Sequence, residues 1–570
     1  MDNQRLLIWA FFGMMVWLTY QAWMQDYGPR PEAAPTTVTQ PVAEQQDPGL
    51  PELEAAADTQ IDAPNVLVPG AEPAMDVVAA SAAAIRVNTD VFGIEISTQG
   101  GTLQYAELQS YPVAKDRPDD LIKLLSAEAA DIGLIQTGLR SAGDGPEANH
   151  LAMFTAAQTT YDMGSSDDLV VLLNWTDGNG IDVEKRYAFK RGSYRIDVTQ
   201  TVTNSSENSW RGAEYAQLKR RLFDQERSMF DVDSYSTDGA IAFNGEKSEK
   251  YTRDDLEDDG PVAFATEAGW FGAIQHHFVS AIVPAQGVSQ RFNIALTGDA
   301  STASVIGPAA VVNPGESKTF TATVFVGPKL QSQLEEIHPK LKLTVDYGWL
   351  TILSSPLFWL LSKVYSLVAN WGVSIIVVTL LIKLMFYKLT ESSGRSMAKM
   401  RNLQPRLKAL QERYKDDKQQ LSQAMMELYK REKVNPAAGC LPILIQMPFF
   451  LAFYWVLLES VEMRQAPFVL WLTDLSTRDP YFILPLIMGG AMFFQQKLNP
   501  QVGDPVQVKV MQIMPVIFTA FFAFFPSGLV LYWVTNTLLS IAQQWKINKV
   551  VEAEAKAQKS SNKPNKPKKS

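Results

Sequence analysis

The sequence predicts a multi-domain membrane protein, in which an α-helical transmembrane bundle of six spans accompanies a large all-β sandwich soluble domain. Three observations predict this class. Apolar runs long enough to cross a bilayer occur near the N-terminus and throughout the last third of the chain. Between them, apolar and polar residues alternate with the period of two that half-buried strands show. Acidic residues also concentrate there, because residues 24–346 hold 47 of the 61 acidic but only 24 of the 51 basic side chains.

The N-terminal residues 1–26 are expected to form an uncleaved signal-anchor span. Leu6 to Trp23 is apolar and aromatic, and the residues after it are too bulky for a cleavage site. Residues 27–80 contain nine prolines, nine acidic residues and a single basic one. Such a segment cannot bury enough apolar surface to offset its ordering entropy, so we expect a disordered tether.

Residues 81–345 are expected to form the β-sandwich, on the periplasmic side of the membrane. Alternating segments predict strands, and a turn signal at 177–180 separates two of them. The segments with the clearest alternation are 85–87, 93–97, 181–183, 194–198 and 319–326.

Residues 346–550 are expected to form a helical core of an amphipathic surface helix, five spans and a cytoplasmic hairpin. Leu350 to Val368 carries apolar residues at intervals of three and four with serines and a lysine between them, which predicts a helix on the membrane surface. A helix packed on the β-domain is the alternative. The first span is the apolar run at 371–389, and others are expected at 440–458 and 481–498.

The last apolar run, residues 510–545, is expected to form two spans. A single helix of that length would measure roughly 54 Å, whereas the hydrocarbon core is about 30 Å thick. Pro526-Ser527-Gly528 lies near the middle of the run and predicts a tight outer turn. Residues 551–570 are lysine-rich and are expected to form a basic cytoplasmic tail.

The charged segment 395–433 is predicted to form two short antiparallel helices. Asp417 is the expected N-cap of the second helix, and Asn435-Pro436 is expected to end it. Eleven basic and five acidic side chains place this hairpin in the cytoplasm. Its candidate functional side chains are basic: Lys399, Arg401, Arg406, Lys408, Arg413 and Lys415.

The sequence offers no sign of catalysis. A P-loop and a His-Glu-x-x-His zinc motif are both missing, and the four histidines all precede the helical core. We therefore expect no enzymatic activity, no catalytic residue, no metal and no cofactor.

Lys383 is the sharpest candidate, because an ionisable residue inside a span normally faces a bundle interior or a water-filled cavity. Snorkelling to the headgroups is an equally good explanation of its position alone. Other polar residues in or near the spans favour a shared groove that is open to the cytoplasm. The candidate groove residues are Lys383, Gln446, Thr519, Thr535 and Asn536.

Several short motifs in this core resemble the YidC family of membrane protein insertases. They are Ser396-Met397-Ala398-Lys399-Met400, Leu403-Gln404-Pro405, Lys433-Val434-Asn435-Pro436, Gly439-Cys440 and Leu444-Ile445-Gln446-Met447-Pro448. The resemblance is close over 345–550 and looser over the soluble domain, where 269–284 is similar in kind. It implies a β-sandwich of sugar-mutarotase-like shape, and it aligns the family's groove arginine with Lys383, where a lysine keeps the charge but loses bidentate recognition.

The resemblance implies an insertase and chaperone that helps nascent membrane proteins to insert and fold, without nucleotide hydrolysis, alone or with the Sec translocon. The expected partners are nascent membrane proteins, the ribosome, the Sec translocon and the lipid bilayer, and no DNA. Aromatic residues in the spans are candidate contacts for apolar client segments, with ordinary packing as the alternative explanation. They are Phe449, Phe450, Tyr454, Tyr532 and Trp533.

The expected location is the cell inner membrane, as a multi-pass protein with both termini in the cytoplasm. Two other functions suit the polar residues in the spans. A small-solute transporter or channel is one, although the sequence shows no inverted repeat. A structural scaffold in which the β-domain does the work is the other.

Overall fold

The computed structural model describes residues 82–142, 146–222, 238–414, 417–432, 441–498 and 505–561. The chain separates into two compact units. One extends to Asp346 and includes Glu459–Glu462, and the other comprises Tyr347–Leu458 and the residues from Met463 onward. The predicted signal-anchor and tether, residues 1–80, lie outside the described part of the chain.

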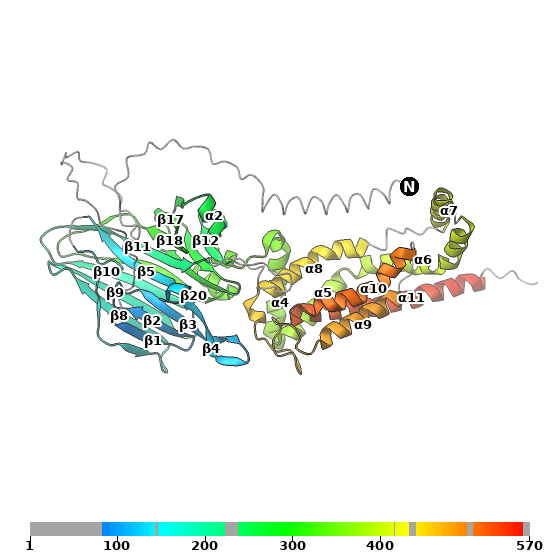
Figure 1. The fold of residues 1–570 in the computed structure, drawn as a ribbon, viewed down its shortest axis with the longest axis horizontal. Coiled ribbons are helices and arrows are strands. Elements are labelled where there is room, and N and C mark those ends of the chain that lie inside the picture. Colours follow the sequence, from blue (N-terminus) through cyan, green and yellow to red (C-terminus); the bar gives the residue numbers. More distant parts are fainter. Residues whose placement is uncertain are drawn as a thin grey trace, which may run out of the picture. The chain divides into compact units, whose positions relative to one another are not determined.

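The first unit is built on two large β-sheets (Figure 1), as the sequence predicts. One sheet consists of β1 (Ala84–Asn88), β2 (Phe92–Ser97), β3 (Leu103–Ala114), β4 (Arg117–Leu125), β5 (Gly133–Ser141), β7 (Thr160–Asp162), β11 (Trp210–Arg221), β14 (Val262–Thr266), β17 (Gln290–Thr297), β18 (Ala300–Ile306) and β19 (Ala310–Val312). The other consists of β6 (Thr155–Ala156), β8 (Asp168–Thr176), β9 (Ile181–Lys190), β10 (Arg195–Asn204), β12 (Gly239–Phe243), β13 (Ser248–Tyr251), β15 (Trp270–Ile274), β16 (Phe278–Pro284) and β20 (Ser317–Pro328).

The strands follow the period of two in the sequence. Along β10, buried residues alternate with half-buried ones over the whole strand, because successive side chains point to opposite faces. The predicted turn between β8 and β9 is present: the Asp177 carboxylate accepts hydrogen bonds from the backbone N–H groups of Asn179 and Ile181 at 2.7 and 2.9 Å. Gly178 and Gly180 adopt positive φ, which glycine permits at little cost. Two short α-helices, α2 (Arg253–Asp258) and α3 (Gln331–Ile337), also belong to this unit.

The second unit is helical. Its helices are α4 (Thr351–Val368), α5 (Trp371–Met385), α6 (Tyr387–Arg413), α7 (Lys418–Arg431), α8 (Leu441–Glu459), α9 (Ile483–Leu498), α10 (Pro505–Phe522) and α11 (Ser527–Ser561). The central helix is α11, which packs against α5, α6 and α9. The predicted break at 526–528 is confirmed, since α10 ends at Phe522 and α11 begins at Ser527.

The long apolar run at 371–389 is not one helix, contrary to the sequence-based prediction. Helix α5 ends at Met385, α6 begins at Tyr387, and the two are bent by 68°. At 15 residues, α5 is only about 22 Å long, shorter than a typical hydrocarbon core. The first hairpin helix is consequently part of α6, which has 27 residues and is not short.

Helix α4 is apolar on more than one face. Leu357, Phe358 and Leu361 are buried, and Ser354 is buried as well, where its hydroxyl donates to the carbonyl of Ala452 in α8 at 3.1 Å. The exposed face mixes apolar Ile352 and Trp359 with polar side chains. The predicted separation into one apolar and one polar face is therefore incomplete.

By length and composition, one described helix is long and apolar enough to cross a membrane. It is Gly348–Val368, which consists of α4 and the 3-10 turn before it. The bent pair formed by Trp371–Met385 and Tyr387–Met400 passes the same test together, and Ile445–Glu459 and Met511–Phe522 are shorter apolar helices. The count of six spans stays a prediction.

The hairpin and the C-terminal segment differ in part from what was expected. Asp417 caps α7 as predicted, accepting from the N–H groups of Gln419 and Gln420 at 3.0 and 2.9 Å. The helix ends at Arg431, and the predicted stop at 435–436 lies outside the described residues. Helix α11 continues to Ser561 and therefore includes the first part of the predicted tail.

Candidate functional site

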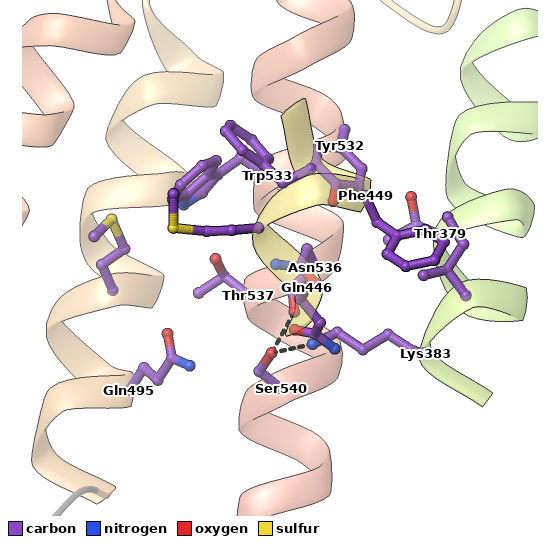
Figure 2. Close-up of a pocket in the computed structure, with 14 residues that line it drawn as sticks. Thr379, Lys383, Gln446, Phe449, Gln495, Tyr532, Trp533, Asn536, Thr537 and Ser540 are labelled. Carbon is purple, nitrogen blue, oxygen red and sulfur yellow. Dashed lines mark hydrogen bonds between the residues drawn. The ribbon is translucent and has the colours of Figure 1, made fainter. Parts of the chain in front are cut away.

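A partly open cavity of about 290 Å³ lies within the helical unit (Figure 2). Four helices that are far apart in the sequence, α5, α8, α9 and α11, supply its walls. The lining residues are Thr379, Ile382, Lys383, Gln446, Met447, Phe449, Phe450, Met492, Gln495, Tyr532, Trp533, Asn536, Thr537 and Ser540. Amides and hydroxyls thus share the cavity with aromatic rings and methionines.

Lys383 provides the positive charge of this cavity. It lies in the last turn of α5, its side chain is almost fully covered, and its ammonium donates a hydrogen bond to the Ser540 hydroxyl at 2.8 Å. Figure 2 shows the side chain reaching across from α5 to α11. No other charged residue is among the 14 that line the cavity, so the described walls contain no carboxylate that could neutralise it.

The structure brings together three of the five predicted groove residues. Lys383, Gln446 and Asn536 line the cavity, whereas Thr519 and Thr535 do not. The Thr519 hydroxyl donates to the carbonyl of Pro515 at 2.7 Å and lies against Gly489 of α9, so this residue packs α10 onto α9. Thr535 is buried on α11, outside the lining.

Another polar side chain near the spans, Gln496, has a structural role. Pro515 has no N–H group, so it leaves the carbonyl of Met511 without its usual helical donor. The side-chain amide of Gln496 donates to that carbonyl. This contact links α9 to α10 at the point where proline interrupts the helix.

Four polar lining residues were not among the predicted groove residues: Thr379, Gln495, Thr537 and Ser540. Helical spacing offered a signal for Ser540, because it follows Asn536 by four residues and therefore lies on the same face of α11. Thr379 precedes Lys383 by the same interval on α5. The hydroxyl of Thr379 bonds within its own helix, to the carbonyl of Ile375 at 2.6 Å.

Four of the five predicted aromatic contacts line the cavity, and Tyr454 does not. The Phe450 ring packs against Trp533 with centroids 4.6 Å apart and against Tyr532 at 5.8 Å. Phe449 packs against Phe386, where α5 ends, at 5.0 Å. Their role as contacts for apolar client segments stays a prediction, and Tyr532, at 6% exposed, would first have to be uncovered.

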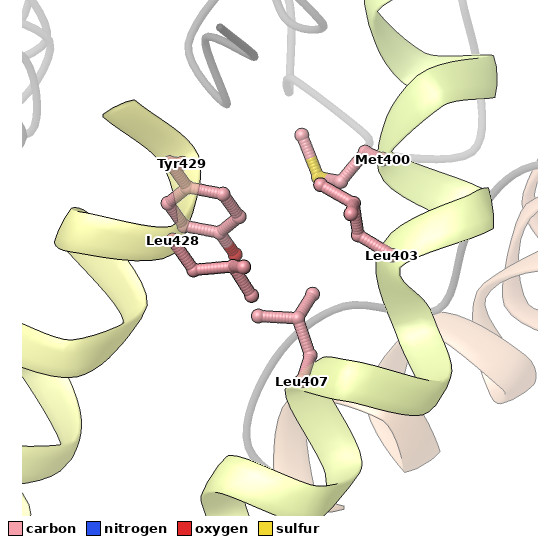
Figure 3. Close-up of a cluster of buried hydrophobic side chains, with 5 residues drawn as sticks. All are labelled: Met400, Leu403, Leu407, Leu428 and Tyr429. Carbon is pink, nitrogen blue, oxygen red and sulfur yellow. The ribbon is translucent and has the colours of Figure 1, made fainter. Parts of the chain in front are cut away.

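The two helices of the hairpin, α6 and α7, pack against each other through a small cluster of buried hydrophobic side chains (Figure 3). Met400, Leu403 and Leu407 of α6 meet Leu428 and Tyr429 of α7. Among the predicted basic residues, Lys399, Arg406 and Arg413 are exposed on α6, and Arg406 pairs with Glu432 at 2.7 Å. Arg401 and Lys408 also belong to α6, but their side chains and the whole of Lys415 lie outside the described residues.

Comparison with known proteins covers both units. Residues 363–555 match a family model described as the 60Kd inner membrane protein, and residues 84–360 match one described as the YidC periplasmic domain. A membrane protein insertase YidC of Thioalkalivibrio sulfidiphilus is 45% identical over 568 residues, covering 98% of this chain and 100% of that protein. Another, from Nitrosococcus oceani, is 45% identical and covers 97% of this chain and all of that protein.

A solved structure titled "Active YidC insertase crystal structure with the first transmembrane domain resolved" is 20% identical, with a TM-score of 0.38. That match covers 81% of this chain and 94% of the other. The assignment rests on the family models and on the relatives, which agree along nearly the whole length. The chain belongs to the YidC family of membrane protein insertases, proteins of the inner membrane with a periplasmic domain.

Proposed function

We propose that the cavity between α5, α8, α9 and α11 receives the polar segment of a nascent membrane protein, with Lys383 as the charge that attracts acidic segments. One observation carries this proposal: a covered ammonium faces a polar cavity whose described lining contains no acidic residue. A charge kept in a membrane helix without a counter-charge is costly, and such residues mark substrate pathways. The two donors that the ammonium does not use toward Ser540 can bind a client carboxylate.

The cavity would act by shortening the hydrocarbon barrier. The polar segment of the client is partly solvated by Lys383, Gln446, Asn536 and the neighbouring hydroxyls, so it crosses less apolar medium. The short α5 and the 16-residue α9 favour a locally thin bilayer beside the cavity. Partition of the client's apolar segment into lipid supplies the driving force, at about 25 cal/mol per Å² buried, and no nucleotide is needed.

The proposed topology has six spans: the N-terminal anchor, α5, α8, α9, α10 and the apolar part of α11. The excess of basic residues favours a cytoplasmic α6–α7 hairpin, which can meet the ribosome and the emerging chain there. A periplasmic β-domain and a cytoplasmic hairpin require an odd number of crossings between them. Since α5 supplies one, α4 lies at the outer membrane surface, where Trp359 and Lys363 suit the interface.

The function is proposed to be mechanical and electrostatic, not enzymatic. The chain works alone or beside the Sec translocon, and both termini lie in the cytoplasm. The β-domain is proposed to carry no sugar chemistry, because a shared fold does not bring a shared site.

Site-specific photo-crosslinking to ribosome-bound nascent chains tests the proposal. A photoreactive residue at Gln446 or Asn536 should capture the polar segment of a stalled client. The matched control is Leu384, next to Lys383 on α5, which is 58% exposed and outside the lining. Capture of the polar segment from position 384 as efficiently as from 446 and 536 would contradict a path through the cavity.

A further inference from the structure

The hydroxyl of Ser540 connects Lys383 to the backbone of α11 (Figure 2). It donates to the carbonyl of Asn536 at 2.7 Å and accepts from the Lys383 ammonium at 2.8 Å. A serine hydroxyl has a single hydrogen, and here that hydrogen is donated to a carbonyl of the same helix. The oxygen is thereby left as an acceptor directed at an ammonium, which can only donate.

Lys383 would be poorly positioned without this acceptor. Its side chain has four methylene groups and lies in the last turn of α5, from where it can extend toward the helix end. Among the described residues, the bond to Ser540 is the single hydrogen bond that its ammonium makes. Removing the hydroxyl leaves the charge free to leave the cavity, although the helix that carries it is unchanged.

We propose that Ser540 is a positioning residue, which holds the Lys383 ammonium inside the cavity and presents its remaining donors to acidic client segments. This inference rests on the proposed function of the cavity. It predicts that the contribution of Ser540 depends on Lys383 and on the charge of the client. A serine that only packs two helices together would have neither dependence.

The test is insertion into proteoliposomes of two clients that differ only in the polar segment, one with aspartates and the other with asparagines. Ser540→Ala should lower insertion of the acidic client about fivefold, as expected for the net loss of one hydrogen bond. The neutral client should change little, and Ser540→Thr should restore most of the loss because it keeps the hydroxyl. Both clients are tested with the same variant, so a lower amount of folded protein affects them equally and cancels in the ratio of their insertion.

Ser374→Ala is the matched control. Ser374 is a fully buried serine on α5 whose hydroxyl donates to the carbonyl of Asn370 at 2.8 Å, and it does not line the cavity. This variant loses the same type of helix contact and should leave the ratio of the two clients unchanged.

A double-mutant cycle with Lys383→Ala completes the test. In that background, Ser540→Ala should have no further effect on the acidic client. A full additional loss there, or equal losses for the two clients, would overturn the positioning role. If Lys383→Ala itself spares the acidic client, the proposed function of the cavity fails together with this inference. If Lys383→Ala impairs that client and Ser540→Ala does not, the inference alone fails.

Discussion

Lys185 bridges the two β-sheets with none of its side chain exposed. Its amine donates to the carbonyls of Gly100 and Thr137 at 2.7 and 2.6 Å, and it lies 4.9 Å from the centre of the Phe154 ring. Burial lowers the pKa of Lys185 from 10.5 to about 7, since the charged form loses its hydration. The neutral amine still has the two hydrogens that these carbonyls need.

This burial predicts a pH-dependent stability of the β-domain. Between about pH 7 and 10.5 the unfolded chain binds a proton on Lys185 and the folded chain does not, so the free energy of unfolding rises with pH. The difference between wild type and Lys185→Met should therefore change by about 1.4 kcal/mol per pH unit in that window. Urea denaturation of residues 82–346 between pH 7 and 9.5 measures it, and a difference that is independent of pH would contradict the account.

The sequence predicts that the Lys185 side chain points into the core, but it does not predict which groups that side chain contacts. Lys185 lies on the same face of β9 as the buried residues Val183 and Tyr187. Its two acceptors are 85 and 48 residues away along the chain, and only the folded sheets bring them together. The same limit applies to Lys383, whose place in a span could be predicted but whose contact with Ser540, 157 residues away, could not.

At the scale of elements, the contact between α9 and α10 depends on one glycine. A Cβ at Gly489 would lie 2.0 Å from the Thr519 hydroxyl, whereas a Cβ at the neighbouring Gly490 would meet nothing within 4 Å. Gly489→Ala should force α10 away from α9 and lower the free energy of unfolding by about 1–3 kcal/mol, as overpacking does. Gly490→Ala should be neutral or stabilising by up to about 1 kcal/mol, because alanine favours a helix. Thermal unfolding of the two variants in the same detergent compares them, and equal midpoints would rule out the close contact.

Helix ends were the least predictable part of the helical unit. Apart from Lys388, the residues from Phe386 to Leu389 are still apolar or aromatic, so composition gives no clear reason to end α5 at Met385. Tertiary contacts favour the bend, because Ala398 of α6 packs with Ile547 and Val551 of α11. Arg395 of α6 also pairs with Glu554 of α11 at 2.8 Å. In contrast, the cap at Asp417 and the break at 526–528 follow from local chemistry and were predicted correctly.

At the scale of the whole molecule, the proposed topology can be tested by cysteine labelling. With Cys440 replaced, single cysteines at positions 200 and 470 should react from outside and a cysteine at 415 only from inside. A cysteine in the tail beyond Ser561 should also react only from inside, because residues 510–545 cross twice. Labelling of the tail from outside would reduce the count to five spans and contradict the proposal.

The β-domain should be dispensable for insertion of a simple client, since the cavity is formed entirely by helices of the other unit. Deleting residues 27–320 while keeping Leu6–Trp23 and 345–550 should leave insertion at no less than about half of the wild-type level. Insertion into proteoliposomes at matched protein amounts is the measurement. Complete loss in a stably expressed deletion would move the function into the β-domain.

The central claim is that Lys383 faces the client as a positive charge, and a charge-reversal experiment tests it most directly. Paired clients that differ only in the charge of the polar segment are inserted into proteoliposomes with each variant at matched amount and orientation. Lys383→Arg should retain activity, and Lys383→Ala should do moderate harm because the cavity stays polar. Lys383→Glu should reduce insertion of the acidic client roughly tenfold or more relative to the basic client, because attraction becomes repulsion. Equal effects of Lys383→Glu on the two clients would show that the lysine anchors a helix and does not meet the substrate.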